Sequence, residues 1–265
     1  MLEPKSSAAI DFLKQWEPEG PWVLSAIAVD QKDMKTATFY PGGKKAKKWL
    51  DKYNGKWNLY FHVNRPMRDL EKKAERQDIK EITWLHIDID PRAGEDLDKE
   101  RERALNLLVE PPEGVPKPTV IIFSGGGYQG FWKLEDPIPV NGDLVKAEDA
   151  KRYNIQLEIV FGGDSCHNID RIMRLPGTIN LPTKTKIKKG RKPILAELLE
   201  FEPDRIYPVS TFTKAPEVQA SEPGALPGGK VDVQISGNIK RLTDIDELDE
   251  MAGDNGPIPD QTKVL

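Results

Sequence analysis

The stretch from Glu81 to Pro91, EITWLHIDIDP, restricts the fold and chemistry of this chain more than any other. Polar and apolar residues alternate along it, which predicts a β-strand with one buried face, because successive side chains of a strand point to opposite sides. The aliphatic face is formed by Leu85, Ile87 and Ile89. The opposite face is formed by Trp84, His86, Asp88 and Asp90.

Asp88 and Asp90 are expected to act at one metal site. Residues two apart on one face of a strand have Cα atoms roughly 6.5–7 Å apart, so their carboxylates can converge on one divalent cation or bridge two. Such pairs support metal-assisted phosphoryl chemistry. The alternative is the polar side of an ordinary half-exposed strand. His86 shares this face, where it either orients a carboxylate or packs as a buried histidine.

Composition excludes other classes of site. The 265-residue chain has one cysteine, Cys166, and three histidines, so an internal disulfide is impossible and no zinc site is expected.

No apolar run approaches the roughly 18 residues of a membrane span. Residues 1–11 lack the basic-then-apolar pattern of a signal peptide. We therefore expect an intracellular, cytoplasmic protein, in the host cytoplasm if its source is viral.

Positive charge is concentrated locally. The net charge of −4 argues against a surface that binds nucleic acid everywhere, yet residues 44–56 and 184–192 are rich in lysine and arginine. Basic segments on an acidic background can contact phosphates. The commoner alternative for each of these two segments is a solvated charged loop. The nucleic-acid contacts expected from the second segment are Lys184, Lys186, Lys188 and Arg191.

The order of predicted elements after residue 80 is β-α-β-β-α-β. Strands are expected at 82–90, 119–123, 128–134 and 171–175, and helices at 96–109 and 144–161. This is the split βαβ plan of ferredoxin-like and RNA-recognition-motif folds, which would place strand 171–175 in the sheet of Asp88. We predict an α+β fold with this catalytic core at residues 81–205, including a strand with a short helix at 194–201.

The remaining segments complete the expected organisation. Residues 1–80 form an N-terminal α/β unit with helices at 6–16, 44–53 and 65–77 and strands at 22–29, 36–40 and 58–63. The catalytic domain is thus residues 1–205. Residues 206–238 are rich in Pro, Gly, Ala and Ser and predict a linker. Residues 239–265 predict an acidic helical tail that leads to a further domain in a longer parent protein.

Two further segments have candidate ligands for phosphate and metal. In the turn SGGGYQ, glycine N–H groups can converge on an anion, aided by a hydroxyl and an amide; a plain hairpin turn is the alternative. Its candidate residues are Ser124, Gly125, Gly126, Gly127 and Gln129. In the second segment, Asp170 is a candidate acidic ligand, with Asp164 as its rival. The same segment has candidate phosphate ligands in the cations Arg171 and Arg174 and in the amide of Asn180. Asn180 could equally cap the turn that precedes it.

The segments HIDID, SGGGYQGFW and DRIMRLPGTIN, followed by a basic stretch, resemble the three motifs of the archaeo-eukaryotic primase superfamily, in particular primase-polymerase domains of phages and mobile plasmids. The resemblance covers residues 57–192. It implies the primase fold, catalytic metal on Asp88 and Asp90, a triphosphate in the Ser-Gly loop and a third acidic ligand. Where the family usually has a histidine, this chain has Gln129, which brings no positive charge.

The resulting prediction is a DNA primase-polymerase, a template-dependent nucleotidyltransferase that synthesises and extends primers on single-stranded DNA in phage or plasmid replication. It implies two Mg²⁺ or Mn²⁺ ions on Asp88, Asp90 and Asp170, and nucleoside triphosphates as substrates. A helicase in the same parent chain is an expected partner, although no Walker-type loop occurs here. The alternatives are a metal-dependent nuclease or phosphodiesterase and a non-catalytic module that binds single-stranded nucleic acid.

Overall fold

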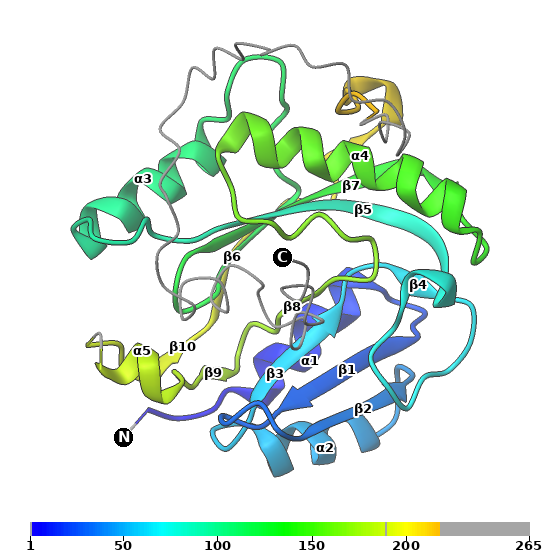
Figure 1. Cartoon of the computed structure of the whole chain (residues 1–265). Coiled ribbons are helices and arrows are strands. Elements are labelled where there is room, and N and C mark those ends of the chain that lie inside the picture. The colour runs from blue at the N-terminus through cyan, green and yellow to red at the C-terminus, as the bar shows by residue number, and fades with distance from the viewer. Residues whose placement is uncertain (1, 189, 218–265) are drawn as a thin grey trace, which may run out of the picture. The chain divides into compact units, whose positions relative to one another are not determined.

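The computed structural model describes residues 2–188 and 190–217. Residues Met1–Ala215 form one compact unit. It contains a larger and a smaller sheet, and helices α3 and α4 cover one face of the larger sheet (Figure 1). No helix in the described part of the chain is long and apolar enough to cross a membrane.

The elements follow one another in three groups. The first is α1 (Ser6–Trp16), β1 (Trp22–Ile27), β2 (Met34–Phe39), α2 (Lys45–Tyr53), β3 (Asn58–His62), β4 (Arg65–Pro66) and the 3-10 helix η1 (Arg76–Asp78). The second is β5 (Ile79–Ile89), α3 (Leu97–Val109), β6 (Val120–Phe123), β7 (Tyr128–Pro139), α4 (Leu144–Phe161) and β8 (Ile172–Arg174). The third is β9 (Ile179–Asn180), α5 (Lys184–Lys188), β10 (Ile194–Leu195), β11 (Glu197–Phe201), β12 (Ile206–Tyr207) and the 3-10 helix η2 (Val209–Thr211).

The larger sheet has β7 at its centre, with β5 next to it. Its strand order is β11-β6-β7-β5-β4, with β12 paired to β7. The expected alternation along β5 is confirmed, because Leu85, Ile87 and Ile89 belong to the core beneath α3 and α4, whereas Trp84 belongs to a second core on the other face. The acidic face of β5 therefore points toward the N-terminal part of the chain.

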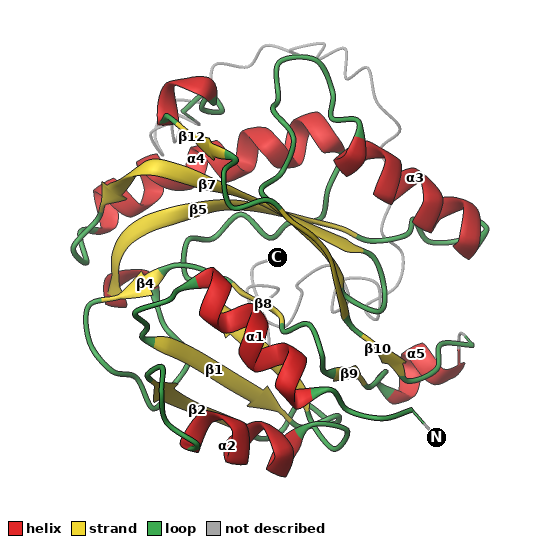
Figure 2. Cartoon of the chain, turned by 180° about the vertical axis from the view of Figure 1, so that it is seen from behind, coloured by secondary structure: helices red, strands yellow, loops and turns green. Residues whose placement is uncertain are grey.

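Helix α1 joins the N-terminal part to this second face. Its Trp16 ring stacks on the Trp84 ring of β5, with ring centroids 3.9 Å apart and planes at 12°. Phe12 lies against Phe61 of β3 at 5.1 Å. Figure 2 shows α1 running between the smaller sheet and the larger one. Burial of these large rings makes the two sheets one folded unit rather than two.

Strand β8 is not where the split βαβ plan places it. Strands β5, β7 and β6 are adjacent in the expected order, but β8 pairs with β3 in the smaller sheet, whose order is β2-β1-β3-β8. On that edge of β5, β4 pairs only with the start of the strand, and further along the His86 N–H donates to the Asn154 side chain of α4. The Arg174 side chain of β8 donates hydrogen bonds to Asn58 and Tyr60 of β3, each 2.9 Å long. The α+β fold class is confirmed, and the predicted sheet membership of strand 171–175 is wrong.

The helix expected at residues 65–77 is also absent. Only a short strand at Arg65–Pro66 and the 3-10 helix Arg76–Asp78 are regular there. Pro66 has no N–H for a helical hydrogen bond. The backbone of Leu70 instead bonds Thr38 of β2, with its N–H donating to Thr38 Oγ1 at 2.8 Å and its carbonyl accepting from it at 3.1 Å. Residues 194–201 likewise form strands β10 and β11 without the expected short helix.

The folded unit extends past the expected start of the linker at residue 206. Strand β12 pairs in parallel with β7. Phe212 is buried in the core beneath α3 and α4, and the Ala215 N–H donates to the Arg152 carbonyl at 3.0 Å. Residues 206–215 are therefore part of the domain. The rest of the expected linker beyond residue 217 and the expected acidic helix lie outside the described residues.

Candidate active site

Asp88 and Asp90 lie at the C-terminal end of β5, where the strand leaves the sheet. Asp88 is half-buried and lies opposite Gln129 of β7, while Asp90 is exposed. Asp88 Oδ1 is buried and has no hydrogen-bond partner. Burial raises the pKa of Asp88 well above its ordinary value, and the negative charges of Asp90 and Asp164 raise it further. Such an oxygen is one that a cation would stabilise.

Asp164 is brought to the same place by two glycines. Gly162 ends α4 in the left-handed conformation, with φ of 60°. A Cβ on Gly163 would lie 2.9 Å from the carbonyl oxygen of Asp88, so only glycine lets this loop approach β5 so closely. The Asp164 N–H donates to the Asp88 carbonyl, and Asp164 Oδ2 accepts from the Asp90 N–H, both at 2.9 Å.

Asp170 has different neighbours. After burial, which raises its pKa, the charges that act on its carboxylate are the cations Lys73, Arg76 and Arg171. Among the hydrogen bonds of the described residues none joins Asp170 to Asp88 or Asp90. Arg171 connects the two regions electrostatically, since its charge lowers the pKa of Asp88, Asp164 and Asp170 alike. The structure thus gathers Asp88, Asp90 and Asp164, with Arg171 nearby.

His86 is a packed histidine, one of the two roles the sequence left open. Its Nε2 lies 3.0 Å from the carbonyl oxygen of Cys166, and its Nδ1 lies 3.3 Å from the side-chain nitrogen of Asn154. This arrangement requires a neutral ring with the proton on Nε2, and burial lowers the pKa of His86 to about 3. Asn154 Oδ1 also accepts from the His86 N–H at 3.1 Å. The pair fastens α4 and the Asp164 loop to β5.

These side chains suit a divalent cation by charge but not yet by geometry. Within the described residues, 2–188 and 190–217, no three acidic, histidine or cysteine side chains lie close enough together to hold an ion in their present positions. Asp88 and Asp164 nevertheless each have a pKa raised by burial and by the charge of Asp90. A hard cation with oxygen ligands, such as Mg²⁺, would relieve this crowding of like charges once the side chains turned toward it.

The loop between β6 and β7, Ser124–Gly127, is called the glycine loop here, and it lies directly against the end of β5. A Cβ on Gly127 would lie 2.6 Å from Asp90 Oδ1 and 2.1 Å from the carbonyl oxygen of Ile89. Ser124 is buried, and its Oγ accepts from the N–H groups of Gly126 at 3.3 Å and Gly127 at 3.1 Å. In this state the loop's own hydroxyl therefore occupies two of the N–H groups expected to bind phosphate.

Asn180 connects the third motif to this loop. Its Nδ2 donates to the Ser124 carbonyl at 2.9 Å, and its Oδ1 accepts from Arg174 Nη2 at 3.3 Å. Arg174 is buried, and its guanidinium lies 4.2 Å from the centre of the Tyr60 ring. Gln129 is also buried, with Nε2 3.4 Å from the sulfur of Met173. Side chains from the second and third motifs thus meet, although the motifs belong to different sheets.

Comparison with solved structures identifies the fold. The archaeo-eukaryotic primase domain of the cyanophage S-2L primase-polymerase superposes with a TM-score of 0.51 and 16% sequence identity, over 77% of this chain and 94% of that one. The chain has the fold of an archaeo-eukaryotic primase domain. The primase fold expected from the three motifs is therefore confirmed.

Two structures of the primase RepB′ show lower similarity. One has a TM-score of 0.48 and 15% identity, over 75% of this chain and 57% of that one. The other, a catalytic domain in complex with initiator DNA, has a TM-score of 0.48 and 13% identity, over 76% of this chain and 87% of that one. No protein-family model and no curated protein matches the sequence.

In this primase fold the first part of the second basic segment, Lys184–Lys188, forms α5 between β9 and β10. Lys184, Lys186 and Lys188 are exposed, and Arg191 is half-buried. Strands β9 and β10 pair with each other. Ile194 of β10 lies close to Gly125, because a Cβ added to that glycine would be only 2.5 Å from Ile194 Cγ2. The basic segment is therefore attached next to the glycine loop (Figure 1).

Sequence reasoning missed one cation at the loop, Arg101 of α3. Its Nη2 donates to the Gly125 carbonyl at 3.3 Å, and its Nε donates to the Gly126 carbonyl at 3.4 Å. Helix α3 alternates acidic and basic residues, so nothing in its pattern distinguishes Arg101 from its neighbours. Only the tertiary structure brings it to the loop.

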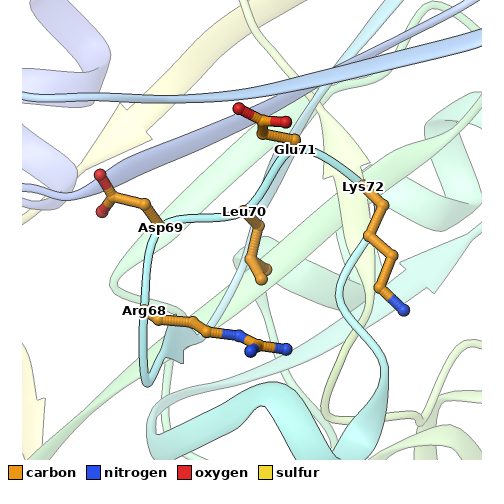
Figure 3. Close-up of a pocket in the computed structure, with 5 residues that line it drawn as sticks. All are labelled: Arg68, Asp69, Leu70, Glu71 and Lys72. Carbon is orange, nitrogen blue, oxygen red and sulfur yellow. The ribbon is translucent and has the colours of Figure 1, made fainter.

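A separate hollow of about 400 Å³ lies in the segment between β4 and η1 of the primase fold. It is lined by Arg68, Asp69, Leu70, Glu71 and Lys72. Figure 3 shows the side chains of Asp69, Glu71 and Lys72 pointing in different directions, so they do not converge on a ligand. None of the motif residues lines this hollow, and it offers no alternative active site.

Proposed function

We propose that the chain is a template-dependent nucleotidyltransferase, a primase-polymerase that makes and extends primers on single-stranded DNA. The observation that supports this most is the position of three carboxylates, Asp88, Asp90 and Asp164, directly beside the Ser124–Gly127 loop. A metal site beside a loop suited to phosphate is what phosphoryl transfer from a triphosphate needs. A fold of this kind hosts other functions, so the proposal depends on the site rather than on the fold.

The residues would divide the work as follows. Asp88 and Asp90, with Asp164 as the third carboxylate, would hold two Mg²⁺ or Mn²⁺ ions, which activate the attacking hydroxyl and stabilise the leaving pyrophosphate when bound. The Ser124 hydroxyl and the N–H groups of the loop would bind phosphate oxygens in place of their present hydrogen bonds to each other. Arg171 and Arg174 would neutralise phosphate charge.

The exposed lysines of α5 would contact the template. Because α5 follows β9, whose Asn180 bonds the glycine loop, a strand bound there would lie near the incoming nucleotide. These contacts with the phosphate backbone would depend on salt and not on base sequence.

Nucleotide incorporation tests the proposal. We expect the chain to incorporate labelled nucleoside triphosphates on a single-stranded DNA template with Mg²⁺ or Mn²⁺, and to lose this activity entirely when EDTA removes the metal. Omission of the primer shows whether the chain starts synthesis itself. Shortening of an end-labelled template without incorporation would instead establish the nuclease reading. Metal-independent binding of single strands with neither activity would establish the binding module.

Asp164 and Asp170 can be compared directly as the third carboxylate. We expect Asp164→Asn to weaken Mn²⁺ binding and to reduce incorporation by about a hundredfold, because this carboxylate lies against Asp90. Asp170→Asn should change Mn²⁺ affinity by less than about threefold, because its charged neighbours are cations. Calorimetric titration with Mn²⁺ measures the affinity of both variants, and the incorporation assay measures their activity. The reverse ranking of the two variants would return Asp170 to the metal site.

A further inference from the structure

Arg101 is the cation that contacts the glycine loop in the described part of the chain. Both of its hydrogen bonds go to loop carbonyls, those of Gly125 and Gly126. Its guanidinium lies 5.5 Å from the centre of the Phe123 ring, and its charge lowers the pKa of Tyr128 against the effect of burial. The side chain is 22% exposed. Arg101 is thus held at the loop with part of its side chain open to solvent.

The loop itself has no positive charge to offer a triphosphate. Ser124, the three glycines and Gln129 are all neutral. The N–H groups of Gly126 and Gly127 are shared with Ser124 Oγ. Binding of a polyanion at this loop without a nearby cation would leave several negative charges uncompensated beside the carboxylate of Asp90.

The present contacts of Arg101 are weak enough to exchange. Its two hydrogen bonds are 3.3 and 3.4 Å long, which is longer than usual for N–H···O bonds, and they end on neutral carbonyl oxygens. Its ion pair with Asp98 spans 3.8 Å, and the Asp98 side chain is 93% exposed, so this pair contributes little. A guanidinium and a phosphate can form two parallel hydrogen bonds between opposite charges, an attraction that bonds to neutral carbonyls lack.

We propose that Arg101 binds the triphosphate of the incoming nucleotide and holds the glycine loop in shape when no nucleotide is present. The guanidinium, which lies over the Phe123 ring, exchanges two loop carbonyls for phosphate oxygens. This role rests on the proposed function, because it concerns the same nucleotide site.

Nucleotide binding by charge-matched variants tests this role. We compare Arg101→Ala and Arg101→Lys with Lys99→Ala, which removes a positive charge from the same helix at an exposed side chain. The probes are ATP and dATP, with inorganic tripolyphosphate as competitor, and circular dichroism confirms that each variant is folded. We expect Arg101→Ala to weaken both nucleotides and tripolyphosphate by about tenfold or more. Arg101→Lys recovers part of the loss, and Lys99→Ala binds as the wild type does.

Kinetics separate binding from a general structural effect. Arg101→Ala should raise the KM for nucleotide by a similar factor and leave kcat within about threefold, because the contact is made before and during the reaction. Nucleotide affinity within twofold of the wild type in a folded Arg101→Ala variant would overturn the inference, as would a wild type that binds neither ATP nor tripolyphosphate. A wild type that binds triphosphates through Arg101 but incorporates none would overturn the proposed function instead.

Discussion

Asp88→Asn is expected to reduce nucleotide incorporation by about a thousandfold or more while leaving the domain folded. The amide that replaces the carboxylate can no longer neutralise a divalent cation, and metal-assisted phosphoryl transfer depends on that neutralisation. The thermal midpoint of unfolding should stay the same or rise, because the neutral amide removes a half-buried negative charge that Asp90 and Asp164 repel. Incorporation assays and thermal unfolding of the same preparation measure both effects.

Asp136→Asn, which replaces an exposed carboxylate of β7, is the matched control and should change neither quantity. Incorporation by Asp88→Asn within tenfold of the wild type would exclude Asp88 from the metal site. Joint loss of activity and stability would show instead that the carboxylate is needed for folding.

Gly127→Ala is expected to produce the second-largest effect. The new Cβ would lie 2.1 Å from the Ile89 carbonyl oxygen and 2.8 Å from the Asp90 Cα, both backbone atoms that can move only if the end of β5 moves. Overpacking of this kind costs about 1–3 kcal/mol of unfolding free energy. Displacement of Asp90 should also reduce incorporation by about a hundredfold, because small misplacements of catalytic groups are costly. Urea unfolding and incorporation assays measure the two effects.

Gly43→Ala is the control for this substitution. Its Cβ would have no atom nearer than 3.9 Å and its φ is not in the left-handed region, so the variant should be as stable and active as the wild type. An active and stable Gly127→Ala variant would show that the loop can retreat from β5, and the close contact between the two would then have no catalytic role.

The motif-bearing strand could be predicted from the sequence because one signal dominates it. Alternation along β5 separates Leu85, Ile87 and Ile89 from Trp84, His86 and Asp88, and the two hydrophobic cores are divided in the same way. A period of two residues is strong evidence when one face is buried. Residues 65–77 lacked such a signal. Their charged side chains are compatible with a solvated helix, and the two hydrogen bonds between Leu70 and Thr38 that hold the segment extended join residues distant in sequence.

The carboxylate next to Asp88 and Asp90 could not be chosen from the sequence, since Asp164 and Asp170 follow the same helix. The choice depends on where β8 goes, and a strand of three residues has too few side chains to specify a sheet. Arg101 and the internal hydrogen bonds of Ser124 belong to the same class of feature. Each depends on contacts between segments that local patterns do not relate.

The pairing of β8 with β3 has a consequence for how the protein is made. Residues 1–80 contain three of the four strands of the smaller sheet, and the fourth is synthesised only after α4. A fragment ending at residue 80 would leave the backbone edge of β3 unpaired and would lack Trp84, the stacking partner of Trp16. During translation the N-terminal part must therefore wait, incompletely paired, for the chain to reach Arg174. Such long-range closure slows folding, and an open strand edge favours aggregation in the interval.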